Sequence, residues 1–130
     1  MKGDSPDGRP RALIVEDEDT LRELIIVTLG EAFACEEAID AESALARLRG
    51  APPDLMLLDI AMPGRSGIEV LREMRADPDL QRVPVCVVSA WQSPRDVAAA
   101  LEAGADRFLA KPFRVDELAS VARSLVERRR

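Results

Sequence analysis

Short apolar runs alternate along the chain with segments whose apolar residues recur every three or four positions. The runs have the length and composition of buried strands, and they cover residues 12–15, 33–37, 55–58, 83–88 and 107–110. The segments between and after them have the period of an amphipathic helix, with one apolar and one polar face. The sequence therefore predicts five strands and five helices in strict alternation.

The predicted helices begin and end at residues with suitable backbone preferences. Gly30, Gly50 and Gly104 follow the last apolar position of the first, second and fourth helical segments, where glycine is a common terminator. Pro94 opens the fourth segment, because proline is favoured in the first turn of a helix. The apolar residues that we expect to face the core are Leu21, Leu24, Ile25 and Leu29; Ala41, Ala44, Leu45 and Leu48; Ile68, Leu71 and Met74; Val97 and Leu101; and Val115, Leu118, Val121, Ala122 and Leu125.

Strict alternation, with strands that are apolar on both faces, is typical of an α/β fold in which helices cover both sides of a parallel sheet. The chain has 130 residues, of which 47% are hydrophobic, and this suits one domain with its own core. We assign that domain to residues 11–127. Residues 1–10 are polar, contain glycine and proline, and are expected to be disordered. Residues 128–130 are arginines that either offset the negative end of the last helix or begin a linker.

The composition excludes several classes of function. The chain has no histidine and no tyrosine, which excludes phosphohistidine formation on this chain, histidine-based catalysis and most zinc sites. A net charge of −6 opposes contact with nucleic acid, so we expect no direct nucleic-acid binding by this domain. No apolar stretch is long enough for a membrane span or a signal peptide, so we expect a cytoplasmic location without membrane contact. Cys35 and Cys86 lie in apolar runs and are interpreted as small buried hydrophobic residues.

Polar side chains follow four of the predicted strands at the point where each strand ends. They are Glu16 and Asp17 after the first strand, Asp59 after the third, Ser89 after the fourth and Lys111 after the fifth. In an open parallel sheet, ligands bind at the carboxyl ends of the strands, beside the point where the strand order reverses. We therefore expect these five residues to converge at one edge of the sheet.

Three carboxylates at one edge repel one another strongly. Two unit charges about 4 Å apart interact by about 4 kcal/mol at an effective dielectric constant of about 20, and a single lysine cannot neutralise three acids. An incomplete shell of carboxylates, with room for water and phosphate oxygens, is the usual arrangement around Mg²⁺. One carboxylate could then attack phosphorus to form an aspartyl phosphate, while a hydroxyl and an ammonium bind the phosphoryl oxygens. Asp59 is the predicted nucleophile, and Mg²⁺ is the predicted cofactor.

Four segments of the sequence resemble one known family. They are VEDE at residues 15–18, LMLLDIAMPGRSG at 55–67, VVSA at 87–90 and GADRFLAKPF at 104–113. Together, over residues 11–127, they resemble the receiver domains of two-component response regulators, which are CheY-like. The resemblance implies a flavodoxin-like fold of three layers, in which the five parallel strands have the order 2-1-3-4-5.

The resemblance also implies roles for the residues at the sheet edge. Glu16, Asp17 and Asp59 would hold Mg²⁺. The backbone carbonyl of Ala61 would complete this set, and Lys111 would pair with a phosphoryl group on Asp59. The donor would be a histidine kinase or a histidine phosphotransfer domain in a phosphorelay. The chain would then be a phosphoacceptor regulator that catalyses only its own phosphorylation and dephosphorylation, rather than an enzyme acting on a separate substrate.

A second group of residues would turn phosphorylation into a signal. By the same resemblance, the Ser89 hydroxyl would turn toward the new phosphate and Phe108 would swing inward behind it. This movement would change the surface of the fourth helix, the fifth strand and the fifth helix, where an output partner or a second copy of the chain would bind. The bond between Lys111 and Pro112 would be cis. Trp91 lies two residues beyond Ser89, and we expect it to shield the acyl phosphate and lengthen its lifetime.

Two alternative functions are considered. Hydrolases of the haloacid dehalogenase type also place a nucleophilic aspartate after an apolar parallel strand. They need a second acid two residues later, where this chain has Ala61. A phosphate-independent interaction module would keep the fold without using the acidic residues, and the intact set of acids argues against it.

Overall fold

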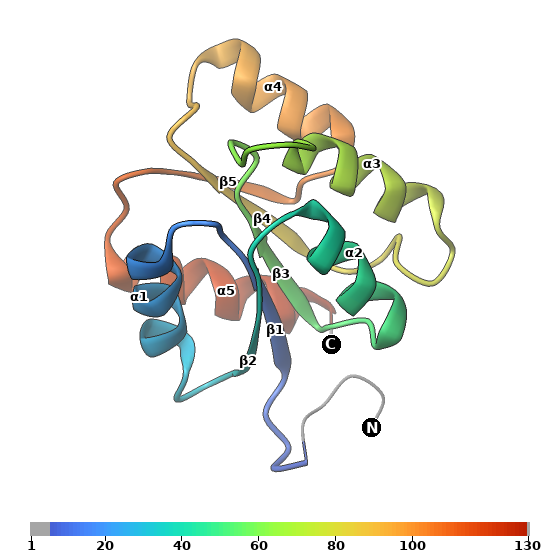
Figure 1. The fold of residues 1–130 in the computed structure, drawn as a ribbon. Coiled ribbons are helices and arrows are strands. Elements are labelled where there is room, and N and C mark those ends of the chain that lie inside the picture. The colour runs from blue at the N-terminus through green and yellow to red at the C-terminus, as the bar shows by residue number, and fades with distance from the viewer. Residues whose placement is uncertain (1–5, 130) are drawn as a thin grey trace.

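The structure is a computed structural model that describes residues 6–129, with side chains described for residues 6–127. In that part of the chain, the centre is a sheet of five parallel strands in the order β2-β1-β3-β4-β5 (Figure 1). The strands are β1 (Arg11–Val15), β2 (Ala34–Ala38), β3 (Leu55–Leu58), β4 (Val85–Ser89) and β5 (Arg107–Ala110). The predicted strand order and the parallel pairing are confirmed.

Helices cover both faces of this sheet (Figure 1). They are α1 (Asp19–Leu29), α2 (Ala41–Gly50), α3 (Gly67–Ala76), α4 (Pro94–Ala103) and α5 (Val115–Arg129). Helices α1 and α5 pack on one face, whereas α2, α3 and α4 pack on the other. The fold is therefore the three-layer α/β arrangement that the alternation predicts. Over the described residues, none of these helices combines the length and the apolar character that crossing a membrane requires.

Each strand of the sheet contributes to two separate cores, because successive side chains of a strand point to opposite faces. In β1, Leu13 and Val15 pack with the residues of α2, α3 and α4. Ala12 and Ile14 pack with the residues of α1 and α5. All four side chains are buried. This explains why the strand is a continuous apolar run rather than an alternating one.

Side-chain caps fix the first turns of the helices that follow the central strands. Ser66 caps α3 by accepting a hydrogen bond from the amide of Glu69, and Ser93 caps α4 in the same way through the amide of Asp96. Gly104 ends α4 in the left-handed conformation, with φ of 116°, which glycine adopts without strain. The loops after β3 and β4 are therefore held between a strand and a capped helix.

The core-facing side of α4 differs from the prediction. Ala100 is fully buried, whereas Leu101 is 47% exposed and Val97 is half-buried. Because each residue turns a helix by about 100°, burying Ala100 carries Leu101 out of the interface. A small residue at this contact lets α4 lie close to α3. Leu24 of α1 and Val115 of α5, also predicted to face the core, are 44% and 48% exposed because they lie at the edges of their apolar stripes.

The segments that flank the predicted domain lie partly outside the described residues. Residues 1–5 of the tail that we predict to be disordered are outside them. In the described part of the tail, Arg9 Nη1 donates to the carbonyl oxygens of Gly30 at 2.6 Å and Phe33 at 3.2 Å. The side chains of residues 128–130 are also outside the described part, so the role of these arginines stays a prediction.

Both cysteines are free thiols that belong to the packing of the sheet. Cys86 is fully buried in β4, and Cys35 is half-buried in β2. Burial raises the pKa of Cys86 to about 12. Burial also raises the pKa of Cys35. These thiols are therefore packing residues, as the sequence indicates.

Candidate functional site

The carboxyl edge of the sheet gathers buried polar residues. Glu16, Asp59 and Ser89 are 2%, 4% and 0% exposed, although charged and polar groups are seldom buried this fully. The five predicted residues lie just after or at the ends of four neighbouring strands: Glu16 and Asp17 after β1, Asp59 after β3, Ser89 at the end of β4 and Lys111 after β5. The structure therefore brings together all five residues that the sequence predicts at this edge.

Backbone hydrogen bonds extend the sheet into the site. The amide of Asp59 donates to the carbonyl oxygen of Val15 at 3.0 Å, which ties Asp59 to the end of β1. The amide of Lys111 donates to the carbonyl oxygen of Ser89 at 3.0 Å, which ties Lys111 to the end of β4. The register of the sheet therefore decides which functional side chains meet.

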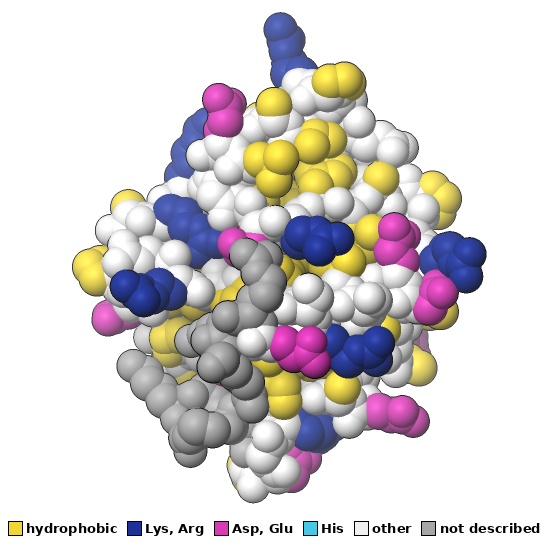
Figure 2. Space-filling view, turned by 180° about the vertical axis from the view of Figure 1, so that it is seen from behind, with side chains coloured by type: hydrophobic (Ala, Val, Ile, Leu, Met, Phe, Trp, Pro, Cys, Tyr) yellow, Lys and Arg dark blue, Asp and Glu magenta, His cyan; other side chains and the backbone are white. Residues whose placement is uncertain are grey.

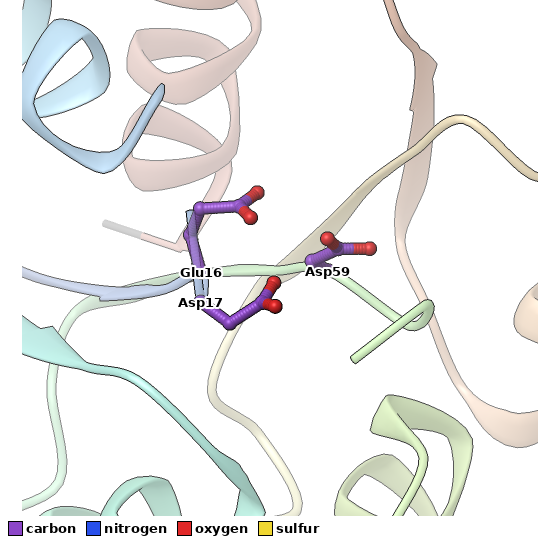
Figure 3. A group of neighbouring side chains, drawn as sticks. All are labelled: Glu16, Asp17 and Asp59. Carbon is purple, nitrogen blue, oxygen red and sulfur yellow. The ribbon is translucent and has the colours of Figure 1, made fainter. Parts of the chain in front are cut away.

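Three carboxylates form a compact group at this edge (Figure 3). One oxygen from each of Glu16, Asp17 and Asp59 lies within 4.8 Å of the others. Figure 3 shows the side chains of Glu16 and Asp17 extending from the end of β1 toward Asp59. Glu16 and Asp59 are buried, whereas Asp17 is exposed. The group is thus accessible to a small ion from the side of Asp17.

The ammonium of Lys111 pairs with two of the three carboxylates. Its Nζ is 2.9 Å from Glu16 Oε1 and 3.0 Å from Asp59 Oδ2. Burial by itself lowers the pKa of Lys111, but the hydrogen bonds to Glu16 and Asp59 outweigh burial and leave the pKa raised. On Glu16, burial is the largest effect and raises the pKa of the carboxyl despite the hydrogen bond from Lys111. The ion pair therefore stabilises the charged form of Lys111. For Glu16, it does not fully offset the cost of burying the ionised carboxylate.

Backbone amides bind the remaining oxygens of the two buried carboxylates. Asp59 Oδ1 accepts a hydrogen bond from the amide of Ala61 at 2.8 Å, and Glu16 Oε2 accepts one from the amide of Glu18 at 3.1 Å. Within residues 6–127, no side chain pairs with the carboxylate of Asp17. Asp17 is therefore the carboxylate most available to an additional cation.

The donor atoms of this group fit a hard divalent cation. Carboxylate and carbonyl oxygens are the ligands that Mg²⁺ and Ca²⁺ prefer. Three carboxylates with one ammonium leave an excess of negative charge, which a divalent cation would offset. The side chains of Glu16, Asp17 and Asp59 could hold such an ion, with the carbonyl oxygen of Ala61 as a backbone ligand.

Gly67, the first residue of α3, is a site residue that the prediction misses. A Cβ atom at this position would lie 2.7 Å from the carbonyl oxygen of Asp59 and 2.7 Å from the Cα of Ile60. Only glycine therefore allows the first turn of α3 to lie directly against the backbone of Asp59. The sequence signal was a glycine at the beginning of a helix, where periodicity gives no information about close approach.

The remaining predicted residues surround the acidic group. Ser89 Oγ accepts a hydrogen bond from the amide of Trp91 at 3.0 Å, and the Trp91 side chain is 52% exposed. Phe108 is half-buried and packs against the core that lies under α2, α3 and α4. The peptide bond between Lys111 and Pro112 is cis, as the resemblance implied. Shielding by Trp91 and an inward movement of Phe108 stay predictions.

Comparison with known proteins places these features in one family. The response regulator receiver domain model matches residues 12–123. The DNA-binding response regulator MtrA of Mycolicibacterium smegmatis is 39% identical over 121 residues, which are 92% of this chain and 52% of that protein. The transcriptional regulatory protein PrrA of Mycobacterium leprae is 43% identical over 122 residues, which are 92% of this chain and 51% of that protein. The chain thus spans about half the length of these relatives.

Solved structures show the same similarity over the whole domain. The receiver domain of the Francisella response regulator 1452 has a TM-score of 0.87 and 28% identity, and the match covers 94% of this chain and 100% of that chain. The signal receiver domain of a signal transduction histidine kinase from Syntrophus aciditrophicus has a TM-score of 0.84 and 34% identity, covering 91% of this chain and 90% of that chain. The sequence motifs, the strand order and these matches agree, and the chain belongs to the response regulator receiver domain family.

Proposed function

We propose that this domain is a switch controlled by phosphorylation of Asp59, with a histidine kinase or a histidine phosphotransfer domain as the donor. The observation that carries the proposal is the position of the Asp59 carboxylate. It is 4% exposed, lies 3.0 Å from the ammonium of Lys111, and shares a group of three acids with Glu16 and Asp17. A carboxylate held between an ammonium and further acids is suited to accept a phosphoryl group when a cation is present.

The cation in this proposal is Mg²⁺, held by Glu16, Asp17 and Asp59 with the backbone carbonyl of Ala61. When bound, Mg²⁺ supplies positive charge that offsets the repulsion between the acids and the incoming phosphoryl oxygens. The support for this assignment is the excess of negative charge, because Lys111 is the only ammonium or guanidinium that pairs with the three acids in the described part of the chain.

The transfer step uses groups that already lie at the sheet edge. A carboxylate oxygen of Asp59 forms a bond to phosphorus while the bond between phosphorus and the imidazole nitrogen of the donor breaks, and that nitrogen keeps the electron pair. Lys111 stabilises the negative phosphoryl oxygens. Ser89 Oγ accepts a hydrogen bond from the amide of Trp91, so its own hydroxyl group can donate to a phosphoryl oxygen. These 130 residues contain no histidine, so the phosphohistidine must lie outside this domain.

The switch in this proposal runs from Ser89 and Phe108 to the surface formed by α4, β5 and α5. Phe108 of β5 pairs in register with Val87 of β4, two residues before Ser89, so the two switch residues lie on paired neighbouring strands. Figure 2 shows hydrophobic side chains gathered in the upper part of the molecule, where Figure 1 places α4. Leu101 of α4 is 47% exposed. We propose this surface as the binding site of the output partner or of a second copy of the chain.

The site favours this function over hydrolysis of separate phosphate esters. At the position where a haloacid dehalogenase would have its second acid, Ala61 has no acidic side chain, and its backbone amide donates a hydrogen bond to Asp59 Oδ1. Hydrolysis of the aspartyl phosphate would then be a reaction of the phosphorylated domain alone, without turnover of a separate phosphate ester. A phosphate-independent module would have no use for the buried carboxylate of Asp59 beside the half-buried ammonium of Lys111, because burying charged groups costs free energy.

Phosphorylation by a small donor tests the proposal. With Mg²⁺ and acetyl phosphate, the chain should gain the mass of one phosphoryl group in an intact-mass spectrum, and EDTA should prevent the gain. Asp59→Asn should abolish it, because the nucleophilic oxygen is lost. Asp79→Asn, which changes an exposed carboxylate between α3 and β4, is the matched control and should gain the mass normally. A mass gain in Asp59→Asn, or none in the unaltered chain, would contradict the proposal.

A further inference from the structure

Arg22 of α1 binds three different acceptors, one of which is the backbone carbonyl of a residue in the acidic group. Its Nη1 donates to the carbonyl oxygen of Glu16 at 2.9 Å. Its Nε donates to Glu37 Oε1 at 2.7 Å, and its Nη2 donates to Asp19 Oδ1 at 2.6 Å. The side chain of Arg22 is only 12% exposed. One guanidinium thus joins α1, the end of β1 and β2, using the fork of donors that distinguishes arginine from lysine.

The carbonyl that Arg22 binds belongs to the peptide group between Glu16 and Asp17. A hydrogen bond to this carbonyl fixes the plane of the peptide, and that plane sets the direction in which the Asp17 backbone continues. The Asp17 carboxylate has no side-chain partner within residues 6–127 and is exposed. Its place in the acidic group therefore depends on the backbone that carries it.

The charges around Arg22 argue against a purely electrostatic role. Glu37 and Asp19 already pair with the guanidinium, so its charge is offset by two carboxylates outside the acidic group. In addition, a positive charge near a cation site would by itself weaken cation binding. What Arg22 contributes to the acidic group is the hydrogen bond to the Glu16 carbonyl.

We propose that Arg22 is a positioning residue for the metal site, which holds the Glu16–Asp17 peptide so that the Asp17 carboxylate faces Mg²⁺. This inference rests on the proposed function, because it takes Mg²⁺ as the ion of the acidic group. The role is comparable to that of the outer groups that orient metal ligands in other proteins, whose loss weakens metal binding by about tenfold or more.

Two substitutions at one position separate positioning from charge. Arg22→Lys keeps the positive charge but cannot bind three acceptors in a plane. Arg22→Met removes both the positive charge and the hydrogen bonds. Mg²⁺ affinity is measured by titrating MgCl₂ into the full chain at constant ionic strength and following its backbone amide NMR signals. Positioning predicts a Kd about tenfold higher in both variants. A charge effect alone predicts an unchanged Kd for Arg22→Lys and a lower Kd for Arg22→Met, and this result would overturn the inference.

Arg75→Met is the matched control for a general loss of stability. Arg75 also binds several acceptors, the carbonyl oxygens of Gly104, Gln81 and Val83, but these lie at the opposite end of the sheet from Asp59. Urea unfolding should show that the Arg75 and Arg22 variants both lose stability. Only the Arg22 variants should lose Mg²⁺ affinity. If Mg²⁺ affinity is equal in the unaltered chain and in all variants, Arg22 is merely structural and the inference is wrong.

A kinetic measurement gives a second readout. In the reaction with acetyl phosphate, Arg22→Lys should need about tenfold more Mg²⁺ for half-maximal rate, while the rate at saturating Mg²⁺ stays close to that of the unaltered chain. A lower rate at saturating Mg²⁺ with an unchanged Mg²⁺ requirement would contradict positioning. If the unaltered chain binds no Mg²⁺, the proposed function fails and takes this inference with it. If the unaltered chain binds Mg²⁺ and the Arg22 variants bind it equally well, only the inference fails.

Discussion

At the scale of one residue, Glu16 shows that a group suited to binding a cation can lower the stability of the folded protein. Its carboxyl is 2% exposed, and burial raises its pKa, with the nearby charge of Asp59 adding to the rise. A carboxyl with a raised pKa in the folded protein contributes stability that is fully present below its unfolded pKa and is lost as the pH rises through its folded pKa. At neutral pH, the ionised Glu16 therefore destabilises the metal-free protein, even though Lys111 binds it.

Glu16→Gln should raise the free energy of unfolding of the metal-free chain at pH 7, because the buried side chain then carries no charge. Glutamine keeps an oxygen that can accept the hydrogen bond from Lys111 but carries no charge. The gain should disappear below the unfolded pKa of glutamate, where Glu16 is neutral in both states. Urea unfolding in EDTA at pH 7 and at low pH measures the difference. Glu18→Gln, at an exposed position next to the site, should change stability little, and a less stable Glu16→Gln at pH 7 would refute this account.

At the scale of elements, the site depends on how closely a helix approaches a strand end. The first turn of α3 lies against Asp59 because Gly67 has no side chain, and the amide of Gly67 also donates to the carbonyl oxygen of Ile60 at 3.4 Å. The atoms that an added Cβ would meet belong to the backbone, which cannot turn aside as a flexible side chain can. The position of α3 and the position of Asp59 are therefore coupled.

Gly67→Ala should lower the free energy of unfolding by about 1–3 kcal/mol, the usual effect of overpacking, and should slow phosphoryl uptake from acetyl phosphate because Asp59 is displaced. Gly50→Ala is the control, since a Cβ at Gly50 would meet nothing within 4 Å. Alanine has the higher helix propensity, so this variant should be as stable as the unaltered chain or slightly more stable. Urea unfolding and intact-mass time courses of both variants test the expectation. Equal behaviour of the two variants would show that the close approach has no effect.

The elements also show where sequence reasoning succeeds and where it stops. The bounds of β3 are predicted correctly, because a short continuous apolar run between turn residues fits a buried strand better than a helix. The side of α4 that faces the core is not predicted correctly, because an alanine-rich helix contains several apolar stripes. Only the packing of α4 on α3 selects Ala100 over Leu101 as the buried residue. Arg22 is missed for a related reason. Its acceptors come from different elements, since Glu37 reaches it from β2 and the Glu16 carbonyl from the end of β1, and sequence periodicity does not show such contacts.

At the scale of the whole molecule, the topology assembles the site. Parallel strands in the order 2-1-3-4-5 place the ends of β1, β3, β4 and β5 at one edge, so the rule for open sheets was sufficient to predict that Asp59 and Lys111 meet although 52 residues separate them. The same rule does not predict distances or protonation. Those depend on burial and on hydrogen bonds such as that from Ala61 to Asp59, which only the folded chain defines.

Because the three acids come from the ends of two strands, they meet only in the folded chain, and Mg²⁺ should stabilise the whole domain. At a free Mg²⁺ concentration about ten times Kd, the gain in unfolding free energy should be about 1.4 kcal/mol, seen as a higher midpoint of thermal unfolding. Asp17→Asn should lose most of this gain, because it removes an acid of the site without disturbing the pairs of Lys111. NaCl at matched ionic strength is the necessary control, since a chain with a net charge of −6 gains some stability from screening alone. An equal rise with NaCl, or an undiminished response of Asp17→Asn to Mg²⁺, would mean that the acidic group does not bind the ion.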